Sequence, residues 1–145
     1  MLIVMPDARF DTAEFEEGVI GDRAEVRVYQ AGSLDDVPDD VWAAADGLLI
    51  WGRTPCNAAM LDRTPKARIV VRMGVGFDAI DIEEAGKRGV VACNVPDYGT
   101  TDVADHAIGL MLALTRGIVR HHINLVDEPV AKWRGIETPA VRQAR

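Results

Sequence analysis

The chain has 145 residues, of which 48% are apolar and 27% are charged. It is therefore long and apolar enough to bury the core of one domain, which excludes a disordered polymer. Its 16 basic and 23 acidic residues give a net charge of −7, which disfavours binding to nucleic acids or acidic membrane surfaces. Cys56 and Cys93 belong to no C-x-x-C or Cys/His cluster, so we expect no disulfide scaffold, no zinc site and a reducing, cytoplasmic location.

The first 95 residues alternate between short β-branched runs and segments with helical spacing. The runs begin at Met1 to Met5, which lacks the basic lead of a signal peptide and predicts a strand. Such alternation is typical of a parallel sheet covered by helices on both faces, so we expect an α/β, flavodoxin-like fold of about five strands. The predicted strands are Leu2–Met5, Val26–Tyr29, Leu48–Trp51, Arg68–Arg72 and Val90–Asn94, and the predicted helices are Phe15–Ile20, Val37–Ala45, Asn57–Leu61 and Ile82–Arg88.

A different pattern follows Pro96. Thr100, Thr101 and Asp102 offer helix-capping side chains, and the proline-free run Val103–Leu125 predicts one long helix. Apolar residues surround most of its axis, so we expect this helix to be buried on several sides. The longest apolar run in the chain has eight residues, Ala107–Leu114, which is far below the roughly 20 that cross a bilayer. We expect no membrane span.

The stretch R-M-G-V-G-F-D-A-I-D, residues 72–81, places two glycines directly after a predicted strand. Glycines at this position let backbone N–H groups point outward and hold a small anion. A tight strand exit that needs glycine for its backbone angles is the simpler interpretation, and spacing alone favours it. The stretch is not a dinucleotide-binding fingerprint, because position 79 is Ala where G-x-G-x-x-G requires Gly.

The stretch A-C-N-V-P-D-Y-G-T-T-D-V-A-D-H-A, residues 92–107, leaves the last predicted strand and enters the long helix. Asn94 and Tyr98 offer an amide and a phenol at the same sheet edge, although Asn-Val-Pro by itself favours an ordinary turn. Asp102 and His106 share a helix face, but one pair without a third ligand does not make a metal site. His121 and His122 have no carboxylate at the spacing of a catalytic pair, so we interpret them as solvated.

Taken together, R-x-G-x-G-x-D-x-I-D, A-G-x-x-G, C-N-V-P and V-A-D-H-A, in this order over residues 67–120, resemble the D-isomer-specific 2-hydroxyacid dehydrogenase superfamily. The resemblance is closest to the branch that contains the C-terminal binding protein corepressors. It implies that the Val75 and Gly76 amides hold the substrate carboxylate and that Val75 also touches the nicotinamide cofactor. It further implies that Asn94 and Tyr98 contact substrate and that Val103 contacts the cofactor.

The resemblance also implies what the chain lacks. The family's G-x-G-x-x-G cofactor loop, its substrate-clamping Arg and its Glu-His acid/base pair lie downstream of residue 145. We therefore expect no catalytic residue in this chain, no NAD or NADP bound to it alone, and either cofactor in the full-length protein. The implied organisation is a substrate-binding domain over 1–99, an interdomain helix over 100–126 that pairs two subunits through residues 101–125, and a linker over 127–145.

The expected function is the substrate-domain part of an NAD(P)-dependent dehydrogenase that moves a hydride between nicotinamide and a small 2-hydroxy or 2-oxo acid. An NAD-sensing corepressor scaffold is the alternative, and Tyr98 favours the enzyme because the corepressors have a small residue there. A receiver-like signalling domain of similar fold is disfavoured. Pro6-Asp7 supplies one acid after the first strand where a receiver needs two, and no Lys follows Asn94.

Overall fold

The structure, a computed structural model, describes residues 1–127. It divides into two compact units, Met1–Tyr98 and a second that begins at Gly99, and each is described by itself. The predicted linker over 127–145 lies outside the described residues apart from Asp127.

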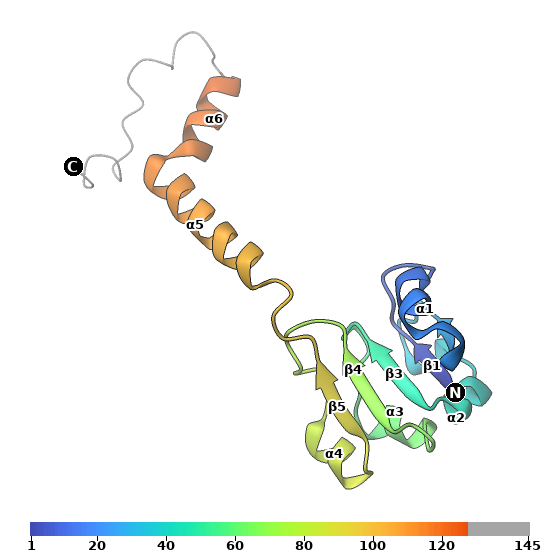
Figure 1. The fold of residues 1–145 in the computed structure, drawn as a ribbon. Helices are drawn as coiled ribbons and strands as arrows, with labels where there is room; N and C mark the ends of the chain where they lie inside the picture. The colour runs from blue at the N-terminus through green and yellow to red at the C-terminus, as the bar shows by residue number, and fades with distance from the viewer. Residues whose placement is uncertain (128–145) are drawn as a thin grey trace. The chain divides into compact units, whose positions relative to one another are not determined.

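The first unit is built on a five-stranded parallel sheet with the order β2-β1-β3-β4-β5. All strands point the same way, so their carboxyl ends lie along one edge (Figure 1). This confirms the flavodoxin-like α/β prediction, and each predicted strand is found with its ends within one residue. The strands are β1 (Leu2–Met5), β2 (Glu25–Val28), β3 (Gly47–Ile50), β4 (Ile69–Arg72) and β5 (Val91–Asn94).

Four short α-helices connect the strands: α1 (Glu14–Ile20), α2 (Asp39–Ala44), α3 (Ala58–Arg63) and α4 (Ile82–Lys87). Two 3-10 turns that the sequence did not predict, η1 (Gly21–Arg23) and η2 (Leu34–Asp36), precede β2 and α2. The start of α3 is fixed by Asn57, whose side-chain oxygen accepts from the Ala59 and Met60 N–H groups at 3.0 and 3.3 Å. Asp81 caps α4 in the same way through the Glu84 N–H, at 2.9 Å.

The main core lies between the sheet and helices α2, α3 and α4. One row of side chains crosses the sheet in register, Val4, Leu48, Val70 and Ala92, and the first three are buried. Trp42 of α2 packs in this core and donates its indole N–H to the Leu34 carbonyl at 3.0 Å. Large apolar side chains packed here, each worth about 1.5–3 kcal/mol on burial, hold the strand exits in place.

The opposite face of the sheet is covered less completely. Met5, Ala8 and Ala13 form a small cluster beside α1, so helices do lie on both faces. Ile69 and Val91, which pair in register and alternate with the buried row, are 40% and 57% exposed. The sheet is therefore covered on this face mainly near β1 and β2.

The second unit corrects the prediction of one long helix. Its described part is two helices, α5 (Thr100–Arg116) and α6 (Ile118–Asp127), separated by Gly117. Gly117 is in the left-handed conformation at φ 64°, and its N–H bonds to the Leu114 carbonyl at 3.1 Å. A glycine in this conformation ends a helix without steric cost, which is why α5 stops although no proline is present.

Within residues 1–127 no residue of α5 is buried, so the expectation that this helix is buried on several sides stays a prediction for the full-length protein. Most of its large apolar side chains are at least half exposed, including Val103, Ile108, Leu110, Met111, Leu112 and Leu114. Within residues 1–127 no helix combines the length and hydropathy needed to cross a membrane.

Candidate functional site

Two neighbouring strands, β4 and β5, bring the predicted substrate residues together at the carboxyl edge of the sheet. Arg72 and Asn94 end these strands and pair in register. Asn94 Nδ2 donates to the Val75 carbonyl at 2.7 Å, and the Val95 N–H donates to the Gly74 carbonyl at 3.0 Å. The loop after β4 is therefore tied to the end of β5, with its outer backbone facing solvent.

The N–H groups of Val75 and Gly76 are free donors. Among residues 1–127 neither has a hydrogen-bond acceptor, and both residues are exposed. Unpaired backbone N–H groups in a glycine-rich turn form a concave site for an anion. Gly76 adds no side chain of its own to this site, and the nearest neighbour of the place where its Cβ would be is Asp78 Oδ2, at 3.6 Å.

Arg72 adds a positive charge beside these donors, and the sequence analysis did not single it out. A Cβ at Gly74, whose φ is +154°, would lie 2.8 Å from Arg72 Cζ and closer still to Nη1. A Cβ at Gly52, at φ +91°, would lie 3.7 Å from Arg72 Nε. The guanidinium therefore lies across two glycine loops, and within the described residues it forms no ion pair. Arg72 is the first residue of the R-x-G-x-G motif, so the motif could have indicated it as a site residue.

The loop after β3 is held by a buried carboxylate. Asp7, fully buried after β1, accepts the N–H groups of Trp51 at 2.8 Å, Arg53 at 2.7 Å and Thr54 at 3.1 Å. Gly52 lies between Trp51 and Arg53 in the chain, so these bonds hold it in place next to the Arg72 side chain. From the sequence, Asp7 was considered only as one of the two acids that a receiver domain would need. In the structure its side chain bonds to backbone groups up to 47 residues away along the chain.

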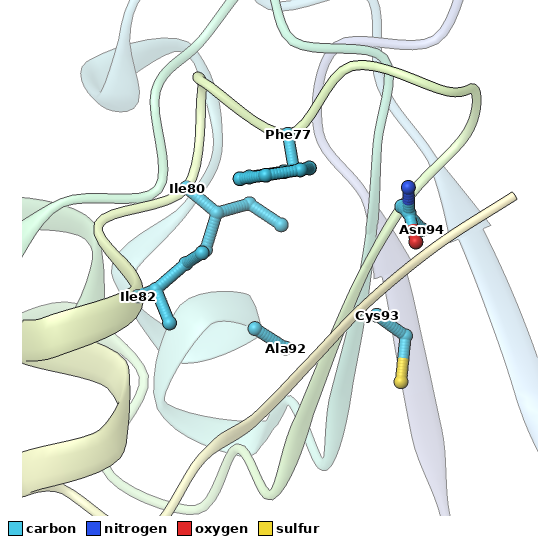
Figure 2. A pocket seen from close by; sticks show the side chains of 6 residues that line it. All are labelled: Phe77, Ile80, Ile82, Ala92, Cys93 and Asn94. Carbon is cyan, nitrogen blue, oxygen red and sulfur yellow. The ribbon is translucent and has the colours of Figure 1, made fainter. Parts of the chain in front are cut away.

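A small cavity of about 170 Å³ lies between β5 and the loop that leads into α4. Figure 2 shows Phe77, Ile80 and Ile82 on one side and Ala92, Cys93 and Asn94 on the other. Its lining is apolar except at Asn94. Asn94 thus lines this cavity at the end of β5.

The two remaining predicted site residues are Tyr98 and Val103. Tyr98 is 69% exposed and has no hydrogen-bond partner in the described part of the chain. Val103 belongs to the second unit, in the first turn of α5, and is exposed. The structure thus brings together Val75, Gly76 and Asn94, and the roles of all five predicted site residues stay predictions.

Other titratable groups do not form a second centre within residues 1–127. No group of three or more His, Cys, Asp or Glu side chains there could hold a metal ion, so Asp102 and His106 have no third ligand. Burial, with a smaller contribution from Asp81, raises the pKa of the Cys56 thiol to about 11. That thiol is therefore uncharged near neutral pH and is no nucleophile.

Comparison with known proteins shows the family of the chain. Residues 5–142 match the family described as D-isomer specific 2-hydroxyacid dehydrogenase, catalytic domain. The chain belongs to this family. It is 38% identical over 99 residues to D-3-phosphoglycerate dehydrogenase of Mycobacterium tuberculosis, covering 68% of this chain and 19% of the relative. It is 35% identical over 106 residues to glyoxylate reductase of Pyrococcus horikoshii, covering 70% and 31%.

Solved structures of the same family share the fold. The D-lactate dehydrogenase of Aquifex aeolicus, complexed with NAD and lactic acid, superposes with a TM-score of 0.78 at 19% identity, covering 92% of this chain and 39% of the other. The NADPH-dependent glyoxylate/hydroxypyruvate reductase of Sinorhizobium meliloti, in complex with citrate, gives 0.70 at 26%, covering 88% and 39%. The chain thus spans about a fifth to two fifths of the length of these relatives.

These relatives are dehydrogenases and reductases, so they do not favour the corepressor alternative. The closer resemblance to the C-terminal binding protein branch is not tested by them and stays a prediction.

Proposed function

We propose that this chain is the substrate-binding part of an NAD(P)-dependent 2-hydroxyacid dehydrogenase. The observation that carries the proposal is the group of donors at the exits of β4 and β5. Two N–H groups that have no acceptor among residues 1–127, at Val75 and Gly76, lie in the loop that the Arg72 guanidinium crosses, and this guanidinium forms no ion pair among the same residues. A carboxylate is the ligand that such a charge-assisted arrangement binds best.

In this proposal the side chain of Asn94 would bind the neighbouring oxygen of the same substrate. Its bond to the Val75 carbonyl fixes the amide plane and uses one of its two N–H donors. The second donor is left for the 2-oxo or 2-hydroxyl group. Carboxylate binding by the loop and oxygen binding by Asn94 together would orient C2 of the substrate, which is the positioning that hydride transfer requires.

The nicotinamide would supply the hydride in the whole protein. The chain's own contribution to cofactor binding is small, since Gly74-Val-Gly76 lacks the third glycine of a pyrophosphate loop and precedes α4, a helix of only six residues. Val75 and Val103 offer apolar contacts at most. We therefore assign the substrate, rather than the cofactor phosphates, to this loop.

For the organisation of the chain we propose the substrate-binding domain at 1–99, a helical segment at 100–126 that pairs two subunits through residues 101–125, and a linker beyond it. The exposed apolar surface of α5 supports the pairing, because apolar patches of this kind are covered in stable proteins.

The test is steady-state kinetics of the full-length protein with NADH or NADPH and a series of 2-oxo acids. Replacing Arg72 by Gln removes a charged donor from the site. Replacing Arg68 by Gln removes the same charge from the opposite edge of the sheet, one residue before β4, where Arg68 is exposed.

We expect Arg72→Gln to raise the KM for 2-oxo acids at least tenfold, which corresponds to about 1.4 kcal/mol, and Arg68→Gln to leave it unchanged. Asn94→Ala and Tyr98→Phe should change KM or kcat several-fold, since each removes a hydrogen bond worth about 1 kcal/mol. Absence of turnover with every 2-oxo acid would refute the proposal, and so would equal kinetics of the Arg72 and Arg68 variants.

A further inference from the structure

A second and larger cavity, of about 330 Å³, lies in the first unit on the α1 face of the sheet. Three of its lining residues mark strand exits: Met5 ends β1, Trp51 follows β3 and Met73 follows β4. Phe10 and Phe15 line it from the β1–α1 connection and from α1. The cavity therefore opens at the carboxyl edge of the sheet, as does the loop after β4 that contains Val75 and Gly76, which we call the carboxylate loop.

The walls of this cavity are mostly apolar, and its two phenylalanine side chains are open to solvent. Phe10 is 62% and Phe15 89% exposed. Phe10 meets the Trp51 ring edge-on at 6.1 Å between centroids. Exposed aromatic side chains gathered around a cavity lose apolar hydration when a ligand enters, which favours an apolar occupant.

The indole N–H of Trp51 is a further sign that the cavity is incomplete as it stands. It is buried and has no hydrogen-bond partner within the described residues. An unsatisfied buried donor costs free energy and calls for an explanation such as a ligand or water.

The cavity and the carboxylate loop are adjacent along the chain. Met73 is fixed by its N–H bond to the Ile50 carbonyl, at 2.8 Å, and only Gly74 separates it from Val75. The Gly74 N–H bonds to the Arg72 carbonyl at 2.8 Å, so the chain turns here, and the Met73 and Val75 Cα atoms are less than the roughly 7 Å apart that two fully extended residues span. A substrate held by its carboxylate at Val75 could therefore extend its side chain toward the cavity.

The charges at the rim decide what kind of side chain fits. Asp11 and Glu16 line the cavity, and one guanidinium, that of Arg9, lies 5.5 Å from the centroid of the Trp51 ring. The two carboxylates outnumber this guanidinium, so an anionic group, such as a phosphate or a second carboxylate, would meet more like charge than opposite charge there. We propose that this cavity receives the substrate's side chain and selects 2-oxo acids with bulky uncharged groups, branched or aromatic, over glyoxylate and over dicarboxylates. The inference rests on the proposed function of the neighbouring loop.

The experiment compares kcat/KM of the full-length protein for four substrates: glyoxylate, which has no side chain, 2-oxo-4-methylpentanoate, phenylpyruvate and oxaloacetate. The variants are Phe10→Ala and Phe15→Ala. Val19→Ala is the matched control, because Val19 is an exposed apolar residue of α1 that does not line the cavity.

We expect the wild-type protein to prefer the two bulky substrates at least tenfold over glyoxylate and oxaloacetate. Each Phe variant should lower the ratio of bulky-substrate to glyoxylate kcat/KM at least fivefold, whereas Val19→Ala should keep the ratio. Because glyoxylate is turned over by the same folded protein, a loss of folding would lower all substrates together and leave the ratio unchanged.

Three outcomes would overturn the inference. A preference for glyoxylate or oxaloacetate in the wild-type protein would overturn it while leaving the proposed function intact. An unchanged ratio in both Phe variants would do the same. Failure to reduce any 2-oxo acid would remove the proposed function and this inference together.

Discussion

Arg72 and Gly74 depend on each other, because the arginine side chain occupies the space where any other residue at position 74 would place its Cβ. The φ of +154° at Gly74 adds a second restriction, since L-residues rarely adopt it. The absence of a side chain at this position is thus what allows a guanidinium to lie against the backbone of the carboxylate loop.

We predict that Gly74→Ala lowers the free energy of unfolding by about 1 kcal/mol or more, through backbone strain and displacement of Arg72. Gly86→Ala is the matched control. Gly86 lies within α4 and has open space around it, so alanine there should stabilise by about 0.5–1 kcal/mol. Urea denaturation measures both, and equal shifts of the two variants would contradict the prediction.

The two cysteines should differ in reactivity. Burial raises the pKa of Cys56 to about 11, while Cys93 is only half-buried. We predict that at pH 8 a disulfide exchange reagent modifies one thiol in the folded protein and two in urea, and that Cys93→Ser abolishes the reaction of the folded protein. Fast modification of both thiols without urea would show that Cys56 is not shielded.

The same shift predicts a pH dependence. An unfolded thiol ionises near pH 8.5–9, so the folded state, which keeps the Cys56 proton, loses this contribution to stability as the pH rises from about 9 toward 11. In Cys56→Ala, the free energy of unfolding should therefore fall less between pH 9 and pH 11 than it does in the wild-type protein.

At the scale of elements, Asp7 connects β1 to the exit of β3. Its three bonds to backbone N–H groups organise a turn that contains Gly52, against which Arg72 lies. A carboxylate suits this position because it only accepts hydrogen bonds.

We predict that Asp7→Asn lowers the free energy of unfolding by about 1–3 kcal/mol, because its amide group must face at least one backbone donor. The amide N–H groups of Trp51, Arg53 and Thr54 should lose protection from hydrogen exchange. Asp22→Asn, at an exposed position in η1, should change neither property. Unaltered protection in Asp7→Asn would show that the turn holds its shape without the carboxylate.

The strands could be predicted closely because each is a β-branched or aliphatic run bounded by Gly, Pro or charged residues, which is how strands of a parallel sheet read. The role of Asp7 could not be predicted from the sequence, since its hydrogen bonds join residues that are 44–47 positions apart. The break at Gly117 was missed because an isolated glycine inside an apolar helix is usually tolerated. Val75, Gly76 and Asn94 could be proposed from their motifs, but the direction of the Arg72 side chain emerges only from packing.

For the whole molecule, the apolar residues of α5 and α6 set the expected state of association. We predict that the 145-residue chain self-associates at tens of micromolar, because several large side chains, each worth about 1.5–3 kcal/mol when buried, lie exposed on α5. Leu114→Lys should shift the protein toward monomer, whereas Val19→Lys, at an equally exposed position of α1, should not. Both residues are 76% exposed. Sedimentation over a concentration series decides, and a wild-type monomer at these concentrations would refute the prediction.

The order of the strands also bears on how the sheet assembles during folding. Register partners in the β3–β4 and β4–β5 pairs are 22 residues apart in the chain, as in Gly47, Ile69 and Val91, and those in the β1–β2 pair are 23 apart. The β1–β3 pair joins residues 44 apart, such as Ile3 and Gly47. Closing a loop of twice the length costs about 0.6 kcal/mol more in entropy. The β1–β2 pair and the β3–β4–β5 group, each formed through short connections, thus meet at the β1–β3 pair. We expect substitutions at the β1–β3 pair to speed unfolding more than they slow refolding.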